Sequence, residues 1–274
     1  MKKNKSLLLS TPYILWMLAF TLIPLGVVVY YALTDSPTTG NFTTANLQQL
    51  LEYLPVFGQS VWYSLISAFI CLLIGYPVAY YIAHRTPLMQ KILYMLVMLP
   101  MCMSFLLRTL AWVGLLQDTG IINTLLGKLG IGPLPLIRNA GAVILGMVYN
   151  YLPFMILPLY SVMLKIQNTT IEAAQDLGCN PFKAFFKVIL PSISSGIVTG
   201  FIMAFTLSLD DFVISYFLAP PNFQPLPLLI YSMTKRRVTP DMYALSTLMF
   251  AAVLTLLILF NFAQARATRK KADR

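Results

Sequence analysis

The chain has 274 residues, of which 58% are hydrophobic and only 10% charged, and its net charge is +10. A soluble globular domain of this length needs more polar surface than that, so this class is excluded. The net charge does not require a nucleic-acid partner, because basic loops beside anionic lipid account for it.

Six mostly apolar runs are each long enough to cross a bilayer as a helix, which takes roughly 20 residues. They are continuous and not alternating, which favours helices over a transmembrane barrel. The sequence therefore predicts an all-α polytopic membrane protein with six transmembrane helices. The six runs are Tyr13–Leu33, Val61–Ala83, Ile92–Gly114, Ala140–Met163, Ser194–Leu218 and Tyr243–Ala263. Prolines inside the runs predict kinks at Pro77, Pro100, Pro153 and Pro158.

The first run follows three lysines, as a secretion signal does. It is longer than the 7–15 residues usual for a signal core, and no Ala-x-Ala site follows it. We therefore expect a retained first span after a short cytoplasmic tail, residues 1–12, and a six-helix membrane domain over residues 13–265. Residues 266–274 form a basic tail.

The distribution of positive charge predicts that both termini lie in the cytoplasm. With the amino terminus inside, most of the 19 basic residues fall on the inner side. The triplet Lys235–Arg237 is an exception and falls outside, at the end of a possible short amphipathic helix, Leu228–Val238. There it faces acidic groups of an extracytoplasmic protein or lipid phosphates, and the sequence does not separate the two.

The segment between the fourth and fifth runs is polar and carries helix boundary signals. Thr169 and Glu172 form a capping box, which starts a helix. Gly178 suits the left-handed end of that helix, and Asn180-Pro181 suits the start of a second one. We expect two short helices at the cytoplasmic surface within residues 164–192, closed by Leu190-Pro191. By physics alone, this segment could equally be a simple connection in which Glu172 only caps a helix.

The spacing of Glu172-Ala173-Ala174, Gly178 and Val188-Ile189-Leu190-Pro191 resembles the EAA motif of bacterial ABC importer permeases. Val188 stands where the family usually has isoleucine. The resemblance implies that the segment is a coupling helix which docks in a groove of a cytoplasmic ABC ATPase. The residues implied in coupling are Glu172, Ala173, Ala174, Gly178, Leu190 and Pro191.

Further motifs resemble the permeases of spermidine/putrescine importers. Three motifs of this chain resemble the B-type subunit: Gly75-Tyr76-Pro77, Arg108-Thr109-Leu110-Ala111-Trp112 and Tyr151-Leu152-Pro153-Phe154. The stretch Thr206-Leu207-Ser208-Leu209-Asp210-Asp211, with the residues from Leu226 to Met233, is closer to the C-type. We favour the B-type. The resemblance implies a polyamine cargo, a second permease subunit, ATPase subunits that bind the ATP, an extracytoplasmic solute-binding protein and a bacterial cell-membrane location.

Ionisable residues within apolar runs are candidates for the substrate path, because a charge facing lipid costs about 2.5–3.5 kcal/mol. Asp210 and Asp211 fall in the outer part of the fifth run, and Arg108 lies at a similar depth in the third. In one interpretation Arg108 pairs with one aspartate while the other caps a helix or meets water. In the other, a carboxylate lines the path of a cationic substrate, with aromatic faces from Trp112, Tyr149 and Tyr151.

The sequence contains neither a phosphate-binding loop nor the spacing of a metal site or catalytic triad, so we expect no cofactor, no metal and no catalysis by this chain alone. Two alternative functions remain at this point. One is an ABC permease for sulfate, phosphate, iron or a sugar. The other is an ion-coupled carrier or channel, which internal inverted repeats would favour.

Overall fold

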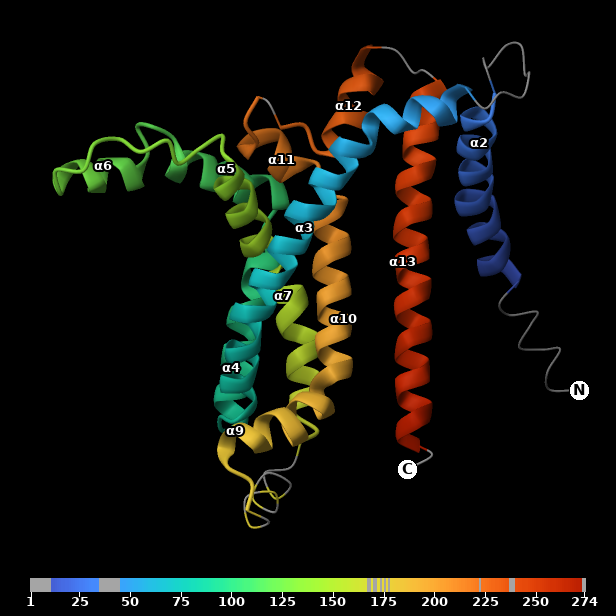
Figure 1. Ribbon diagram of the computed structural model, residues 1–274. Helices are drawn as coiled ribbons and strands as arrows, with labels where there is room; N and C mark the ends of the chain where they lie inside the picture. Colours follow the sequence, from blue (N-terminus) through green and yellow to red (C-terminus); the bar gives the residue numbers. More distant parts are fainter. Residues whose placement is uncertain are drawn as a thin grey trace, which may run out of the picture. The chain divides into compact units, whose positions relative to one another are not determined.

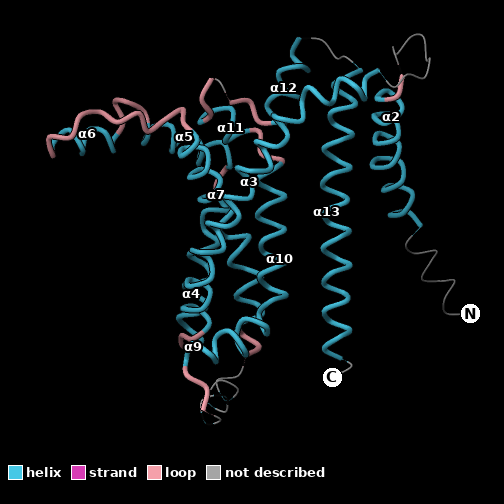
Figure 2. The backbone as a smooth tube through the Cα atoms, viewed as in Figure 1, coloured by secondary structure: helices cyan, strands magenta, loops and turns pink. Residues whose placement is uncertain are grey.

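The computed structural model describes residues 11–34, 45–166, 169, 172, 174, 176, 178–221, 223–236 and 240–272. These residues form helices joined by turns and loops (Figures 1 and 2). Among them, six helices are long and apolar enough to cross a membrane, which confirms the six-span prediction. They are Thr11–Ala32, Leu50–Ala83, Phe105–Lys128, Ala140–Met163, Phe185–Leu209 and Met242–Phe260. The cytoplasmic side of the termini stays a prediction.

The chain divides into two compact units, and the first comprises residues 1–57 and 229–256. It holds the π-helical turn η1 (Leu18–Leu22) and α2 (Ile23–Ala32), with parts of α3 (Ala45–Ala83), α12 (Leu226–Arg236) and α13 (Pro240–Ala272). The Tyr31 and Tyr243 rings lie 5.3 Å apart, which joins the chain before α3 to α13. The helix expected at Leu228–Val238 corresponds to α12. Of the basic triplet, Lys235 lies 4.8 Å from the centre of the Tyr231 ring, and Arg237 lies outside the described residues.

The second unit comprises residues 58–228 and 257–274 and is organised around α7 (Ala140–Met163), whose bounds match the predicted fourth span. α10 (Leu190–Leu209) packs along α7 through two glycines. A Cβ at Gly196 would lie 3.0 Å from the Pro158 carbonyl oxygen, and one at Gly200 would lie 3.0 Å from the Met155 carbonyl oxygen. Small residues at this four-residue spacing let two transmembrane helices approach closely.

The predicted third span, Ile92–Gly114, is wrong as a single helix. α4 (Pro87–Met98) ends in the 3₁₀ turn η2 (Leu99–Cys102), and α5 (Phe105–Leu116) begins after an extended residue. Pro100 lies in η2, and its ring removes a backbone donor that an uninterrupted helix needs. A further short helix, α6 (Ile121–Lys128), follows α5. The predicted kink at Pro100 is thus a complete break.

The predicted fifth span, Ser194–Leu218, is also wrong at both ends. α9 (Pro181–Ala184) passes through the π-helical turn η3 (Phe185–Ile189) directly into α10. Leu190-Pro191 therefore does not close the preceding segment, because the wider π turn accommodates the proline ring within one helical path. α10 stops at Leu209, and a separate helix, α11 (Val213–Leu218), follows. Figure 1 shows α9 at one end of this unit and α5, α6 and α11 at the other.

Candidate functional site

The predicted coupling segment contains a helix that ends at Gly178. The described helical residues before it are Thr169, Glu172, Ala174 and Asp176. Gly178 has a φ of +82°, which residues with a Cβ rarely adopt. The Cys179 N–H donates to the Ala174 carbonyl over 3.0 Å, as in a Schellman helix end. The left-handed stop expected at Gly178 is therefore confirmed.

This turn presents small and acidic residues at the surface. Glu172, Asp176 and Gly178 are exposed, and Ala174 is half-buried. Ala173, the remaining residue of the predicted docking turn, lies outside the described residues.

The second helix of the segment connects the turn rigidly to α10. The Asn180 carbonyl accepts the Ala184 N–H over 2.9 Å, and Pro181 is the first residue of α9, as predicted. Leu190 is half-buried and Pro191 exposed, both within the continuous path from α9 to α10. Since α10 has 20 residues, it carries that path about 30 Å further.

An aromatic contact braces the same segment against α3. The Phe185 ring in η3 meets the Tyr76 ring edge-on, with centres 5.6 Å apart. Phe185 also contacts Phe186 at 5.0 Å. Tyr76 lies near the end of α3, so the segment contacts α3 as well as continuing into α10. Sequence analysis did not identify this contact.

Two charged residues, Arg108 and Asp211, are buried together with Tyr151 at the end of α10 that lies away from α9. The exposed fractions are 8% for Arg108, 7% for Tyr151 and 5% for Asp211. The Tyr151 hydroxyl lies close enough to the Asp211 carboxylate to donate to it, and Arg108 lies within electrostatic range of the same hydroxyl. Arg108 belongs to α5, Tyr151 to α7, and Asp211 to the break between α10 and α11. We call these three residues the charged site.

The break after α10 positions Asp211. Its Oδ1 accepts the Ile214 N–H over 3.4 Å, so the carboxylate caps the first turn of α11. α11 in turn lies against α7 at Gly146, where a Cβ would approach the Ile214 and Leu218 side chains to 2.8 Å. The absence of a side chain at Gly146 thus allows the helix that follows Asp211 to sit close to α7.

The charges of this site are not neutralised by a direct pair. Among the described residues, Arg108 Nε and Nη1 and Asp211 Oδ2 are buried without a hydrogen-bond partner. The Arg108 guanidinium lies instead 5.6 Å from the centre of the Phe105 ring. The interpretation in which Arg108 pairs with an aspartate is therefore wrong, while its other half, an aspartate capping a helix, is confirmed for Asp211. Buried charged groups without partners are costly, and in membrane proteins they mark functional positions.

The other residues predicted to line the substrate path are Asp210, Trp112 and Tyr149, which lie outside the charged site. Asp210 directly follows α10 and is exposed, although its charge still reaches Tyr151. Trp112 and Tyr149 form an edge-on ring pair with centres 5.3 Å apart, so α5 and α7 share a second aromatic contact. Asp210 and Asp211 were both predicted within the fifth run, whereas α10 ends at Leu209 and the two residues lie in the break before α11.

Sequence analysis missed several polar residues buried close to the charged site along the chain. Asn150 Nδ2 donates to the Gly146 carbonyl over 3.0 Å, whereas its Oδ1 has no partner among the described residues. Ser208 Oγ contacts Met147 Sδ at 3.0 Å. Phe105, which lies beside both Arg108 and Tyr151, was also missed. The available signal was that Asn150 directly precedes Tyr151, and that Ser208 lies two residues before Asp210 in a motif already singled out.

The described residues contain no group of three or more histidine, cysteine, aspartate or glutamate side chains that could hold a metal ion. The charged site is therefore made of one guanidinium, one phenol and one carboxylate.

Comparison with known proteins finds relatives along most of the chain. The family described as "Binding-protein-dependent transport system inner membrane component" matches residues 75–272. The spermidine/putrescine transport system permease protein PotB of Haemophilus influenzae is 39% identical over 210 residues, 73% of each chain. PotB of Escherichia coli K12 is 33% identical over 64% of this chain and 65% of that protein. PotC of the same organism is 39% identical over 39% of this chain and 40% of that protein.

Solved structures agree on the fold. A bacterial ABC transporter involved in the import of the acidic polysaccharide alginate superposes with a TM-score of 0.71, covering 97% of this chain and 96% of that one. At 19% identity this likeness concerns the fold alone. The family match covers more than half of the chain and includes the coupling segment and all three residues of the charged site. This chain therefore belongs to the family of binding-protein-dependent transport system inner membrane components.

Proposed function

We propose that this chain is a permease subunit of an ATP-driven importer for polyamines such as spermidine and putrescine, which an extracytoplasmic binding protein delivers. One observation carries the proposal: a buried carboxylate oxygen, Asp211 Oδ2, makes no hydrogen bond of ordinary length to any described residue, although the Tyr151 hydroxyl lies near the same carboxylate. The relatives named as spermidine/putrescine permeases share 33–39% identity over most of the chain.

Ammonium groups supply what the charged site lacks. Each offers several N–H donors and a positive charge, which Asp211 Oδ2 accepts, and the Tyr151 oxygen adds a further acceptor. Trp112 and Tyr149 offer aromatic faces that attract cations. Arg108 keeps the site from accumulating a large negative charge, so that a bound polyammonium ion is able to leave again.

The coupling segment would receive the driving force. In this proposal ATP binds to partner ABC ATPase subunits and not to this chain, and their closure displaces the turn formed by Glu172, Ala173, Ala174 and Gly178. The continuous helix from Pro181 to Leu209 passes this displacement to the break at Asp210 and Asp211. Because the charged site begins at that break, movement of α10 changes the surroundings of Asp211.

Six helices from one chain are few to enclose a path, so the proposal includes a second, related permease subunit. The B-type role is favoured, since the alignments with PotB proteins cover 64–73% of this chain while that with PotC covers 39%. Substrate would pass between the two subunits across the bacterial inner membrane.

Reconstitution tests the proposal. Proteoliposomes containing this chain, the partner permease and the ATPase subunits are supplied with binding protein and labelled spermidine. We expect accumulation only when ATP is available to the ATPase. Accumulation of labelled sulfate, phosphate, iron or a sugar, with indifference to spermidine, would reject the polyamine cargo. Uptake that persists without any ATPase would instead establish an ion-coupled carrier or channel.

Docking of the coupling turn is tested separately by crosslinking. Ala174→Cys is paired with cysteines placed in the ATPase groove, in a background from which Cys71, Cys102 and Cys179 have been removed. We expect a crosslink whose yield changes on addition of nucleotide. As a matched control, Lys165→Cys lies near the end of α7 and is also exposed. Equal crosslinking from both positions would contradict specific docking of the turn.

A further inference from the structure

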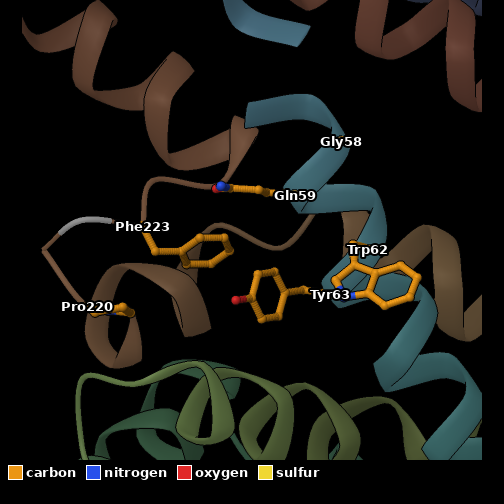
Figure 3. A pocket seen from close by; sticks show the side chains of 6 residues that line it. All are labelled: Gly58, Gln59, Trp62, Tyr63, Pro220 and Phe223. Atoms are coloured by element: carbon orange, nitrogen blue, oxygen red, sulfur yellow. The ribbon is translucent and has the colours of Figure 1, made fainter. Parts of the chain in front are cut away.

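A pocket of about 410 Å³ lies between α3 and the turn that follows α11. Figure 3 shows Tyr63 of α3 pointing toward Phe223 of the turn, while the Trp62 indole extends to the other side of α3. Three of the lining residues are aromatic and none carries a charge. The lining residues are Gly58, Gln59, Trp62, Tyr63, Pro220 and Phe223. We call this the aromatic pocket.

Buried contacts hold both walls of the aromatic pocket in place. The Leu226 N–H donates to Ser60 Oγ over 2.8 Å, which ties the turn after α11 to α3. The Phe223 N–H donates to the Pro220 carbonyl over 3.0 Å, and the Phe223 side chain is buried. The Tyr63 and Phe223 rings meet edge-on with centres 4.5 Å apart. Binding sites for small molecules are usually formed in advance in this way.

The lining chemistry suits one class of ligand. Aromatic faces attract cations, and the indole of tryptophan does so best. Trp62 is among the lining residues and is 63% exposed, so its ring is accessible from outside at the margin of the pocket. Figure 3 shows the Tyr63 hydroxyl and the Gln59 amide as the polar ends of lining side chains. Both contain an oxygen that accepts an N–H, so an alkylammonium ion finds attraction for its charge, its methylene groups and its donors.

We propose that the aromatic pocket is a transit subsite for an alkylammonium group of the cargo, an inference that rests on the polyamine function proposed above. The lack of a carboxylate among its lining residues is consistent with transit. A carboxylate beside three aromatic rings would retain a cation strongly, whereas conduction needs sites weak enough to release it.

The position of the pocket fits a sequence of two sites. Asp211 lies two residues before α11, and Pro220 lies two residues after it. α11 has six residues and is therefore about 9 Å long. A cation in the aromatic pocket is thus one short helix away from the carboxylate of the charged site. The neutral subsite and the charged site would be occupied one after the other.

Substrate protection of an introduced cysteine tests the subsite without relying on transport. Gly58→Cys suits this purpose because a Cβ there meets nothing within 4 Å. The assembled complex, with its native cysteines replaced and the binding protein omitted, is labelled with an ammonium-bearing methanethiosulfonate or its neutral methyl counterpart. We expect the ammonium reagent to react about three- to tenfold faster relative to the neutral one, and spermidine to slow both reactions. Phe69→Cys, on the same helix but outside the pocket, is the control and should show neither effect.

Two aromatic variants sharpen the result. In the Gly58→Cys background, Trp62→Leu should abolish protection by spermidine, while Trp62→Phe, which keeps a ring, should retain part of it. Equal rates for the two reagents together with no protection would overturn the proposal, even if spermidine transport is intact. In a second labelling experiment, solute-free binding protein is added in place of spermidine. Protection by that protein and not by spermidine would also overturn the proposal, because the pocket would then be a protein-docking surface. Failure of spermidine transport with protection intact would instead count against the proposed function alone.

Discussion

The coupling segment and the charged site lie at opposite ends of α10 and are built in opposite ways. The coupling turn is exposed, and its shape comes from residues close together in sequence, above all from the backbone of Gly178. The charged site is buried and is assembled from α5, α7 and the start of α11. Surface substitutions should therefore be tolerated in the first region as long as the backbone keeps its shape. In the second, both the charges and the helix spacing must be preserved.

The largest effect is expected from removing the buried carboxylate. Asp211→Asn removes the only negative charge of the charged site, so that Arg108 stays buried as a lone positive charge in it, which is destabilising. We expect spermidine uptake to fall by more than tenfold and the unfolding temperature of the complex to drop. Uptake within twofold of the wild type would contradict the assigned role.

A double variant separates stability from cargo binding at the same position. Arg108→Gln combined with Asp211→Asn removes both charges, so much of the lost stability should return, as measured in a double-mutant cycle. Uptake should stay low, because the oxygen that accepts the ammonium group has lost its charge. Recovery of uptake together with stability would show that Asp211 is only structural.

Helix spacing at the charged site is tested through Gly146. Gly146→Val places a side chain against Ile214 and Leu218, and overpacking of this kind costs about 1–3 kcal/mol. We expect a lower unfolding temperature and reduced uptake. Gly114→Val, at a helical glycine whose Cβ would meet nothing within 4 Å, is the matched control. If both variants lose the same amount of stability and uptake, the cause is the lower helix propensity of valine and not the close approach of α11 to α7.

Backbone shape in the coupling turn is tested at Gly178. A residue with a Cβ pays about 1–2 kcal/mol in the left-handed conformation, while asparagine adopts it more readily. Because a Cβ there meets nothing within 4 Å, Gly178→Val probes the backbone alone. We expect about five- to thirtyfold weaker recovery of the ATPase with the permease, and near-normal recovery for Gly178→Asn. If both variants assemble equally well with the ATPase, binding of the ATPase does not depend on the left-handed backbone at Gly178.

The smallest effect is expected at the aromatic contact between the coupling segment and α3. Tyr76→Leu removes the ring that meets Phe185, a contact worth about 0.5–1.5 kcal/mol. Tyr76→Phe keeps the ring and serves as the control. We expect Tyr76→Leu to lower the amount of spermidine imported per ATP hydrolysed while assembly is kept. If the amount of spermidine imported per ATP hydrolysed is unchanged, movement of the coupling segment is transmitted through α10 and not through α3.

The two regions also differ in how far the sequence predicts them. Helix boundaries in the coupling segment were predicted correctly because they depend on residue type alone. Glycine favours the helix end at Gly178, and Asn180-Pro181 favours the start of the next helix. The charged site depends on helix breaks inside apolar runs, and the average hydrophobicity of a run does not reveal where its helix is interrupted. Pro100 ends a helix inside an apolar run, and α10 stops at Leu209 although apolar residues continue to Leu218.

The pairing of residues distant in sequence was harder still. That Arg108 lies beside Phe105 and forms no ion pair with Asp211 follows from the packing of α5 and α11 against α7. The role of Gly146 in this packing has no local signature, because a glycine in an apolar helix is common. By contrast, α7 was predicted with its observed bounds, since Asn139 caps its first turn and the apolar run is uninterrupted.

The most direct measurement is ATP-dependent accumulation of labelled spermidine by the reconstituted complex, with this chain as wild type, Gly178→Val or Gly178→Asn. The account predicts accumulation that requires ATP and the ATPase, is strongly reduced by valine and is largely kept by asparagine. Accumulation that proceeds without the ATPase, or that is the same in all three chains, would contradict it.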